Sequence, residues 1–210
     1  MLGRRRVITS ASEERLYRLL EERLESGSNK KEIDERIWDL FGENWCIMFT
    51  DLSGFSRQVA QFGIIHFLQT IHESERLLIP AIDDYDGILL KIEGDSFLVI
   101  FRSPRRALQC SIEMQKILSE YNIGRAAEEQ VLLCVGLGYG KVLKIGDHDV
   151  FGSEVNAASK LGEDTADAGE ILVTGAVQDA TKDMPGVAFE KLDVIPPGAA
   201  SAYRVKYSLS

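Results

Sequence analysis

Short runs of consecutive apolar residues alternate along the chain with longer segments in which apolar positions recur every three or four residues. The first pattern is typical of buried strands and the second of amphipathic helices. The predicted strands cover residues 45–50, 87–93, 96–101, 131–139, 141–145, 171–174, 187–192 and 202–206. The helices predicted between them cover residues 57–82, 104–121, 153–162 and 175–182, the first of them bent near Gly63.

The order of these elements predicts the fold class. Strand, helix, two strands, helix and strand is the order of a ferredoxin-like sheet, so we expect an α/β (α+β) domain with a βαββαβ sheet core and appended strands. Only Gly94-Asp95 separates the second and third strands, which predicts a β-hairpin at this point. Residues 141–145 follow Gly140 and are expected to form the hairpin partner of residues 131–139.

The first forty residues predict two further amphipathic helices. Ser10 and Glu13 form a capping-box pattern at the start of the first helix, and residues 26–29 (Ser-Gly-Ser-Asn) end it. The apolar positions of these two helices are Leu16, Leu19, Leu20, Leu24, Ile33, Ile37, Trp38, Leu40 and Phe41. Such a segment is either a helical hairpin packed on the main domain or a dimerisation or regulatory element, and spacing does not separate the two. We therefore divide the chain into an N-terminal helical segment, residues 1–42, and a main domain, residues 43–210.

Composition narrows the class of protein. The chain has 210 residues, with 24 basic and 33 acidic side chains and a net charge of −9, which argues against a general nucleic-acid binder because such a protein needs a basic surface. No apolar stretch is long enough to predict a membrane span. The three cysteines lie far apart without metal-ligand spacing, as expected of reduced thiols. These features predict a soluble cytoplasmic protein.

Two carboxylates are candidates for a metal site. Asp51 ends the first buried strand and Asp95 lies in the tight turn of the hairpin, and the first and third strands of a ferredoxin-like sheet are neighbours. Oxygen ligands that converge in this way suit Mg²⁺ or Mn²⁺. The backbone amides of Ser53, Gly54 and Phe55, at the start of the next helix, offer donors to a polyphosphate. The alternative is that Asp51 is a helix cap and Asp95 an ordinary turn residue.

Four segments together resemble a known family. They are residues 49–55 (FTDLSGF), 91–96 (KIEGDS), 151–161 (FGSEVNAASKL) and 169–174 (GEILVT). In this order, on the predicted strands and helices, they resemble the signature segments of the class III nucleotidyl (adenylate/guanylate) cyclase catalytic domain. The resemblance covers roughly residues 43–206 and implies a phosphorus-oxygen lyase of cyclic nucleotide signalling.

The resemblance also implies a homodimer with active sites shared between protomers. One protomer then supplies the ligands of two divalent cations, Mg²⁺ or Mn²⁺, and these ligands are Asp51, Asp95 and the backbone carbonyl of Leu52. The other protomer supplies the substrate-binding and catalytic side chains Lys91, Asp149, Asn156 and Lys160. Lys91 and Asp95 therefore belong to different active sites although only four positions separate them.

The pair Lys91 and Asp149 favours adenine as the base of the substrate. A lysine donates to the N1 acceptor of adenine and a carboxylate accepts from its N6 amino group, whereas guanine presents the reverse polarity. A wrong base leaves buried polar groups unpaired, at about 1–3 kcal/mol each. Cytosine also carries a ring acceptor beside an amino donor, so this argument alone does not exclude CTP.

The chain departs from the family pattern at three places. Lys160 stands where the family usually has an arginine, Ile195 stands near the position of a basic triphosphate contact, and the stretch between Gly140 and Asn156 is about five residues short. We expect a metal-dependent adenylate cyclase that converts ATP to 3′,5′-cyclic AMP and pyrophosphate. The alternatives are a catalytically weak or silent nucleotide-binding module of the same fold, and a cyclase for a pyrimidine nucleotide, CTP or UTP.

Overall fold

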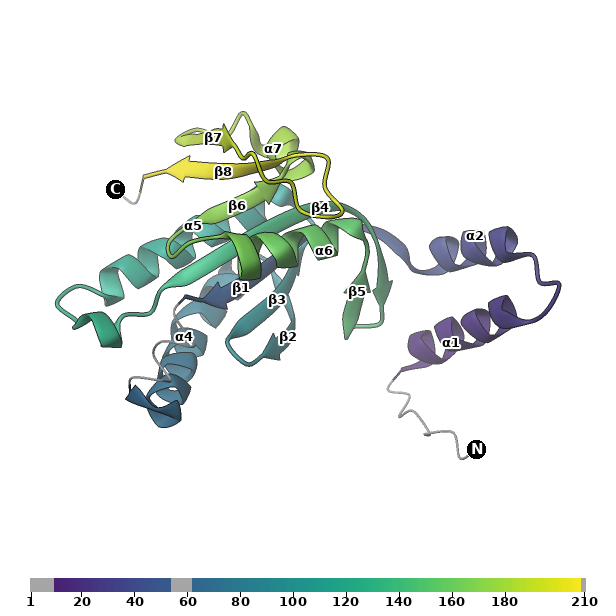
Figure 1. The fold of residues 1–210 in the computed structure, drawn as a ribbon, viewed down its shortest axis with the longest axis horizontal. Coiled ribbons are helices and arrows are strands. Elements are labelled where there is room, and N and C mark those ends of the chain that lie inside the picture. The colour runs from purple at the N-terminus through teal and green to yellow at the C-terminus, as the bar shows by residue number, and fades with distance from the viewer. Residues whose placement is uncertain (1–9, 54–61, 209–210) are drawn as a thin grey trace.

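The protein is built on one mixed sheet (Figure 1). In the computed structural model, which describes residues 10–53 and 62–208, eight strands join with β2-β3-β1-β4-β6-β8-β7 as the main order, and β5 pairs with β4. The strands are β1 (Gly42–Leu52), β2 (Ile88–Glu93), β3 (Ser96–Phe101), β4 (Leu133–Ile145), β5 (Asp149–Phe151), β6 (Ile171–Thr174), β7 (Val187–Lys191) and β8 (Ala202–Tyr207). The helices are α1 (Ala11–Leu24), α2 (Lys30–Phe41), α4 (Ile64–Asp84), α5 (Pro104–Tyr121), α6 (Ser153–Ser159) and α7 (Gly175–Thr181).

The order β2-β3-β1-β4 is that of a ferredoxin-like core, so the predicted fold class is confirmed. Strand β1 lies in the middle because its side chains are apolar on both faces, and Cys46, Ile47 and Met48 are fully buried. It pairs antiparallel with β3 on one side and with β4 on the other. Beyond β4, the strands β6, β8 and β7 extend the sheet as the predicted appended strands.

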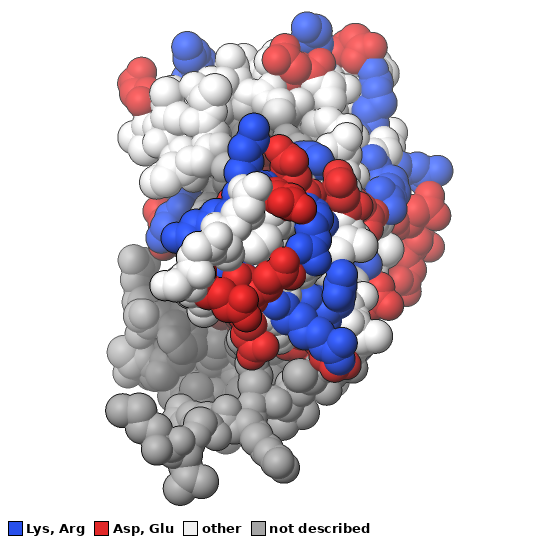
Figure 2. All heavy atoms as spheres, turned by 90° about the vertical axis from the view of Figure 1, so that its right-hand side faces the viewer, with Lys and Arg blue, Asp and Glu red and all other residues white. Residues whose placement is uncertain are grey.

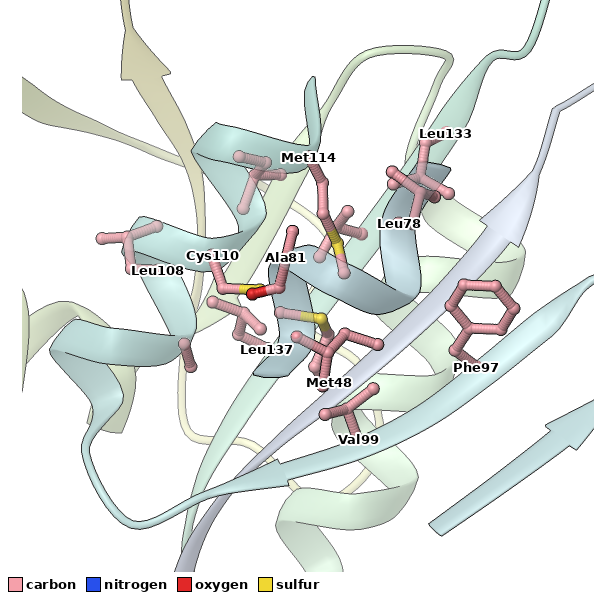
Figure 3. Close-up of a cluster of buried hydrophobic side chains, with 14 of the residues drawn as sticks. Met48, Leu78, Ala81, Phe97, Val99, Leu108, Cys110, Met114, Leu133 and Leu137 are labelled. Atoms are coloured by element: carbon pink, nitrogen blue, oxygen red, sulfur yellow. The ribbon is translucent and has the colours of Figure 1, made fainter. Parts of the chain in front are cut away.

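Helices α4, α5 and α7 cover one face of the sheet and form the larger core with it. Figure 3 shows Met48 and Val99 of the sheet beneath Cys110 and Met114 of α5, with Ala81 of α4 between them and Leu78 of the same helix beside Leu133 of β4. Cys46, Cys110 and Cys134 are all buried and unpaired, which agrees with the expected reduced thiols. The helices on this face thus support the sheet through a continuous apolar core.

Helix α6 covers the opposite face and lies very close to β4. A Cβ atom on Gly136 would stand 2.1 Å from the carbonyl oxygen of Ala158, and one on Gly138 would stand 2.3 Å from that of Glu154. The Glu154 carboxylate accepts hydrogen bonds from the backbone amide of Tyr139, at 3.0 Å, and from the hydroxyl of Thr174, at 2.7 Å. Glycines in β4 and one anchored carboxylate therefore fix α6 against the sheet.

The N-terminal helices form a hairpin that packs on the far end of β4. Ser10 Oγ accepts from the Glu13 amide at 3.2 Å, as the capping pattern predicts, and Asn29 caps α2 in the same way. The hairpin buries a small cluster against Ile145 of β4, made of Leu16, Leu19, Ile33, Ile37 and Phe41. Packing on the main domain is thus observed, while a dimerisation or regulatory role stays a prediction. None of the helices in the described residues is long and apolar enough to cross a membrane.

Two sequence expectations about element boundaries were wrong. Residues 141–145 do not turn back on residues 131–139: they continue β4, which pairs with β1 over the whole length of β1, and the hairpin partner is β5. The chain reverses at Gly146, whose φ of +57° suits glycine, instead of at Gly140. Gly63 likewise begins helix α4 instead of bending it, and residues 57–61 of the expected helix lie outside the described residues.

Candidate active site

Lys91 and Asp149 lie together although 58 positions separate them in the sequence. Lys91 lies on the edge strand β2 just after an irregularity in its register with β3, and such a bulge re-aims the side chains beside it. Asp149 is the first residue of β5. The Lys91 Nζ donates to Asp149 Oδ2 at 2.7 Å, and about a third of each side chain is exposed. The structure therefore brings the two predicted base-contacting residues into one ion pair.

This ion pair lines a small cleft on the face covered by α6. The cleft holds about 130 Å³, and its walls also include Phe49, Ser96 and Glu163. A pocket for a drug-sized ligand measures roughly 300–1,000 Å³, so the cleft of a single chain is too small for a nucleoside triphosphate.

Asp51 and Asp95 lie where strand β1 and the β2–β3 turn meet. Asp51 Oδ1 accepts from Ser96 Oγ at 3.2 Å, and Ser96 directly follows Asp95. Burial raises the pKa of Asp51 to about 6, and the negative charge of Asp95 adds to that rise. Burial also raises the pKa of Asp95. Two half-buried carboxylates therefore share a site in which both disfavour ionisation.

The residues after Asp51 are only partly described. Leu52 ends β1 with its side chain in the core, and the Ser53 amide donates to the Leu132 carbonyl at 2.9 Å. That amide is thus already paired within the sheet end instead of being free for a phosphate. Gly54 and Phe55, the other two predicted phosphate donors, lie outside the described residues.

Asn156 lies on the outer side of α6, and Lys160 directly follows that helix as the first residue of the π-helical turn η2 (Lys160–Thr165). Both are exposed, whereas Val155, Ala157 and Ala158 face the sheet. The Lys160 ammonium pairs with the carboxylate of Asp164. Among the described residues that line the small cleft, neither Asn156 nor Lys160 is present. The structure therefore keeps these two together on one surface but does not join them to Lys91 and Asp149 within the chain.

Sequence reasoning missed Ser96 and Glu163. Ser96 contacts Asp51, and Glu163 lines the cleft and contributes to the raised pKa of Asp51. Glu163 comes from a π-helical turn, η2 (Lys160–Thr165), that follows α6. Regular helical spacing does not place a residue in such a turn. For Ser96 a signal existed, since its position next to Asp95 puts it opposite Asp51 in the antiparallel register.

The fold and these side chains define the class of protein. A sequence model of the family described as the adenylate and guanylate cyclase catalytic domain matches residues 41–199. Because this match covers most of the chain, the protein belongs to that family. The resemblance noted in its signature segments is thereby confirmed.

Individual relatives are more distant. A serine/threonine-protein kinase, pkn2, of Myxococcus xanthus is 30% identical over 135 residues, which make up 64% of this chain and 16% of that protein. An adenylate cyclase of Mycobacterium tuberculosis (strain ATCC 25618 / H37Rv) is 28% identical over 153 residues, or 65% of this chain and 33% of that protein. The chain spans a third or less of the length of these two curated relatives.

Solved structures share the fold. The adenylate/guanylate cyclase/hydrolase from Silicibacter pomeroyi superposes with a TM-score of 0.66 at 24% identity, over 78% of this chain and 96% of that chain. The adenylyl cyclase CyaB from P. aeruginosa gives a TM-score of 0.64 at 21% identity, over 80% and 95% of the two chains. At these identities the likeness concerns the fold of a cyclase catalytic domain and leaves the choice of substrate to be argued from the residues.

Proposed function

We propose that this cyclase domain is a metal-dependent adenylate cyclase that converts ATP to 3′,5′-cyclic AMP and pyrophosphate as a homodimer. The observation that carries the proposal is the ion pair between Lys91 and Asp149. It places a donor and an acceptor side by side at the edge of the cleft, in the arrangement complementary to the N1 and N6 positions of adenine. A guanine in the same place would set donor against donor and acceptor against acceptor.

The metal ligands in this proposal are Asp51, Asp95 and the Leu52 carbonyl. The raised pKa of Asp51 supports the fit of a divalent cation, because the repulsion between two half-buried carboxylates is relieved when a cation binds between them. In the described part of the chain, no group of three or more histidine, cysteine, aspartate or glutamate side chains is arranged so that it could hold a metal ion by itself. Backbone and substrate phosphate oxygens then complete the ligand set, as is usual for Mg²⁺. Two such ions lower the pKa of a hydroxyl and neutralise charge on a triphosphate.

In the reaction, the ribose 3′-oxygen attacks the α-phosphorus in line with the leaving group. A bond forms between these atoms, the bond from the α-phosphorus to the oxygen bridging it to the β-phosphate breaks, and pyrophosphate leaves as the hydroxyl proton passes to water. Asn156 orients the ribose and Lys160 stabilises the charge that develops on the phosphate. Asn156 on α6 and Lys160 directly after it are both exposed, which supports their use by the partner's half of a shared site.

The second protomer is needed for two physical reasons. The cleft of about 130 Å³ is too small for ATP, and the exposed Asn156 and Lys160 lie outside it. A two-fold dimer gives each chain both halves of a site, because every interaction then occurs twice. One chain carries all the proposed groups, so a homodimer forms two equal sites.

Product analysis tests the proposal. The purified protein is incubated separately with ATP, GTP, CTP and UTP, each with Mg²⁺ and with Mn²⁺, and Asp51→Ala serves as the inactive control. Cyclic AMP formed mainly from ATP supports the proposal. A cyclic pyrimidine nucleotide as the main product would overturn the base assignment, and a folded dimer without any cyclic product would favour a silent binding module.

A further inference from the structure

A large cavity lies between the N-terminal hairpin and the β4–β5 hairpin, which stand side by side in Figure 1. It holds about 700 Å³, within the usual range for small-molecule sites. Most of its walls are apolar, and Leu20, Trp38 and Phe151 are more exposed than core side chains normally are. Helices α1 and α2 and strands β4 and β5 all contribute, so the cavity exists because the hairpin packs where it does.

The charges in its walls do not call for a charged ligand. Arg23 and Lys91, which line it within the described residues, already pair with Asp34 at 2.6 Å and with Asp149 at 2.7 Å, and the imidazole of His148 is a further basic group in the wall. Glu13 adds a further acidic group to the wall. On the side of the molecule shown in Figure 2, acidic and basic side chains are interspersed instead of forming one basic patch. An anion would meet no unpaired lysine or arginine here, whereas an uncharged aromatic molecule finds an apolar surface of fitting size.

Lys91 and Asp149 line this cavity as well as the small cleft. The pair therefore separates the two spaces and is contacted from both. A molecule in the larger cavity removes water from the pair, and an ion pair shielded from water is stronger. Adenine, which must take over hydrogen bonds of both partners, then binds less tightly.

From this geometry we propose that the cavity under the N-terminal hairpin binds a small uncharged aromatic molecule, and that its occupation weakens the binding of ATP through the Lys91–Asp149 pair. The binding part stands on the cavity alone. The effect on ATP rests on the proposed adenylate cyclase function. The hairpin thereby acquires a role that its sequence left open.

Binding is measured with N-phenyl-1-naphthylamine, an uncharged probe whose fluorescence rises in apolar surroundings, and with 8-anilinonaphthalene-1-sulfonate, which adds an anionic group to a similar scaffold. We expect saturable binding of the uncharged probe, with the sulfonate at least about tenfold weaker. Leu20→Arg, in the cavity wall, should weaken the uncharged probe about tenfold or more. Leu24→Arg, at the end of the same helix and outside the wall, should leave it unchanged.

Far-UV circular dichroism and the thermal midpoint verify that each variant folds. If Leu20→Arg does not fold, Leu20→Asn replaces it. Absence of saturable binding, equal binding by the wild type and a folded Leu20 variant, or preference for the sulfonate would each overturn the site.

For the effect on ATP, a saturating concentration of the uncharged probe should raise the KM for ATP about threefold or more with kcat unchanged. In Leu20→Arg the probe should leave the KM unchanged. A probe that binds without changing the KM overturns the coupling. If no cyclic nucleotide forms at all, the proposed function fails while the binding result still decides the site.

Discussion

Lys91 Nζ and Asp149 Oδ2 lie 2.7 Å apart and join the edge strand β2 to the start of β5. In the free chain each side chain satisfies the other, so neither polar group is left unpaired where it is partly buried. A base that inserts there must replace this single bond by one bond to each partner. In the proposed function, the polarity of this donor and acceptor, which their strands hold in place, selects the base of the nucleotide.

Exchange of this polarity should change the preferred nucleotide. In Lys91→Glu with Asp149→Cys the acceptor and the donor change places, so the double variant should lose most of its preference for ATP over GTP. We expect the ratio of kcat/KM values for the two substrates to fall about a hundredfold, since each mismatched polar group costs about 1–3 kcal/mol. The measurement compares the rate at which cyclic AMP forms from ATP with the rate at which cyclic GMP forms from GTP, under equal conditions.

The single variant Asp149→Asn provides the matched comparison. It keeps the size of the side chain but removes the charge that pairs with Lys91, so it should lower kcat/KM for ATP without making GTP a substrate. A double variant that keeps the full ATP preference of the wild type would show that this pair does not read the base.

Lys160→Arg should raise the rate of the proposed reaction. Lys160 keeps a positive charge but lacks the planar fork with which arginine donates two parallel hydrogen bonds to phosphate. The side chain is exposed and pairs only locally with Asp164, so the larger guanidinium fits without disturbing the core. We expect kcat to increase about tenfold with little change in KM. Lys182→Arg, in a similar exposed pair with Asp179, is the control and should have no effect. Equal kcat in Lys160→Arg and the wild type would contradict a role in the transition state.

The central elements could be predicted from the sequence because local signals decide them. Strand β1 is a continuous apolar run, and Gly94-Asp95 leaves no alternative to a hairpin between β2 and β3. Helix α5 has the predicted bounds because Pro104 starts it and its apolar positions recur with helical spacing. The expected closeness of Asp51 and Asp95 agrees with the effect of the Asp95 charge on the pKa of Asp51, while their role as metal ligands stays a prediction.

The remaining features depend on contacts that no local pattern encodes. Gly140 resembles a turn residue, but pairing with the long β1 keeps β4 extended through it. The position of Glu163 depends on a π-helical turn, and the Lys91–Asp149 pair depends on the trimmed β4–β5 hairpin. The cavity beneath the N-terminal hairpin exists only because Leu16 and Ile37 of the hairpin pack against Ile145 of β4.

Gly136→Ala should destabilise the domain strongly. Its Cβ would stand 2.1 Å from the Ala158 carbonyl oxygen, so α6 must move away from the sheet and the Glu154 hydrogen bonds must weaken. We expect a loss of about 3 kcal/mol or more in the free energy of unfolding, measured by urea denaturation. At Gly140 a Cβ would meet only the Cγ of Glu154, at 3.0 Å, and its Cβ, at 3.9 Å, and no backbone atom within 4 Å, so Gly140→Ala should cost about 1 kcal/mol or less. Equal losses in the two variants would refute the close packing of α6 on β4.

Asp51→Asn should stabilise the metal-free protein while it abolishes turnover. The pKa of Asp51 is raised to about 6, by burial first and then by Asp95, so the folded state holds a proton that the unfolded state has released. Below the unfolded pKa of 3.8 the carboxyl group is protonated in both states, so its burial costs the wild type no ionisation energy. As the pH rises from there towards about 6, the wild type loses stability. Above that pH the variant should be more stable by about 1–2 kcal/mol, after the full shift is reduced for solvent screening.

Urea denaturation with EDTA at pH 4 and at pH 8 measures this difference, which should be small at the lower pH and full at the higher one. Asp147→Asn is the matched control, because Lys144 lowers the pKa of that exposed carboxylate. Loss of the Asp147 charge should leave the free energy of unfolding at pH 8 unchanged or slightly lower, whereas Asp51→Asn should raise it. If Asp51→Asn is no more stable than the wild type at pH 8, the two carboxylates do not repel each other in the free protein. A bound cation would then have no repulsion between Asp51 and Asp95 to relieve.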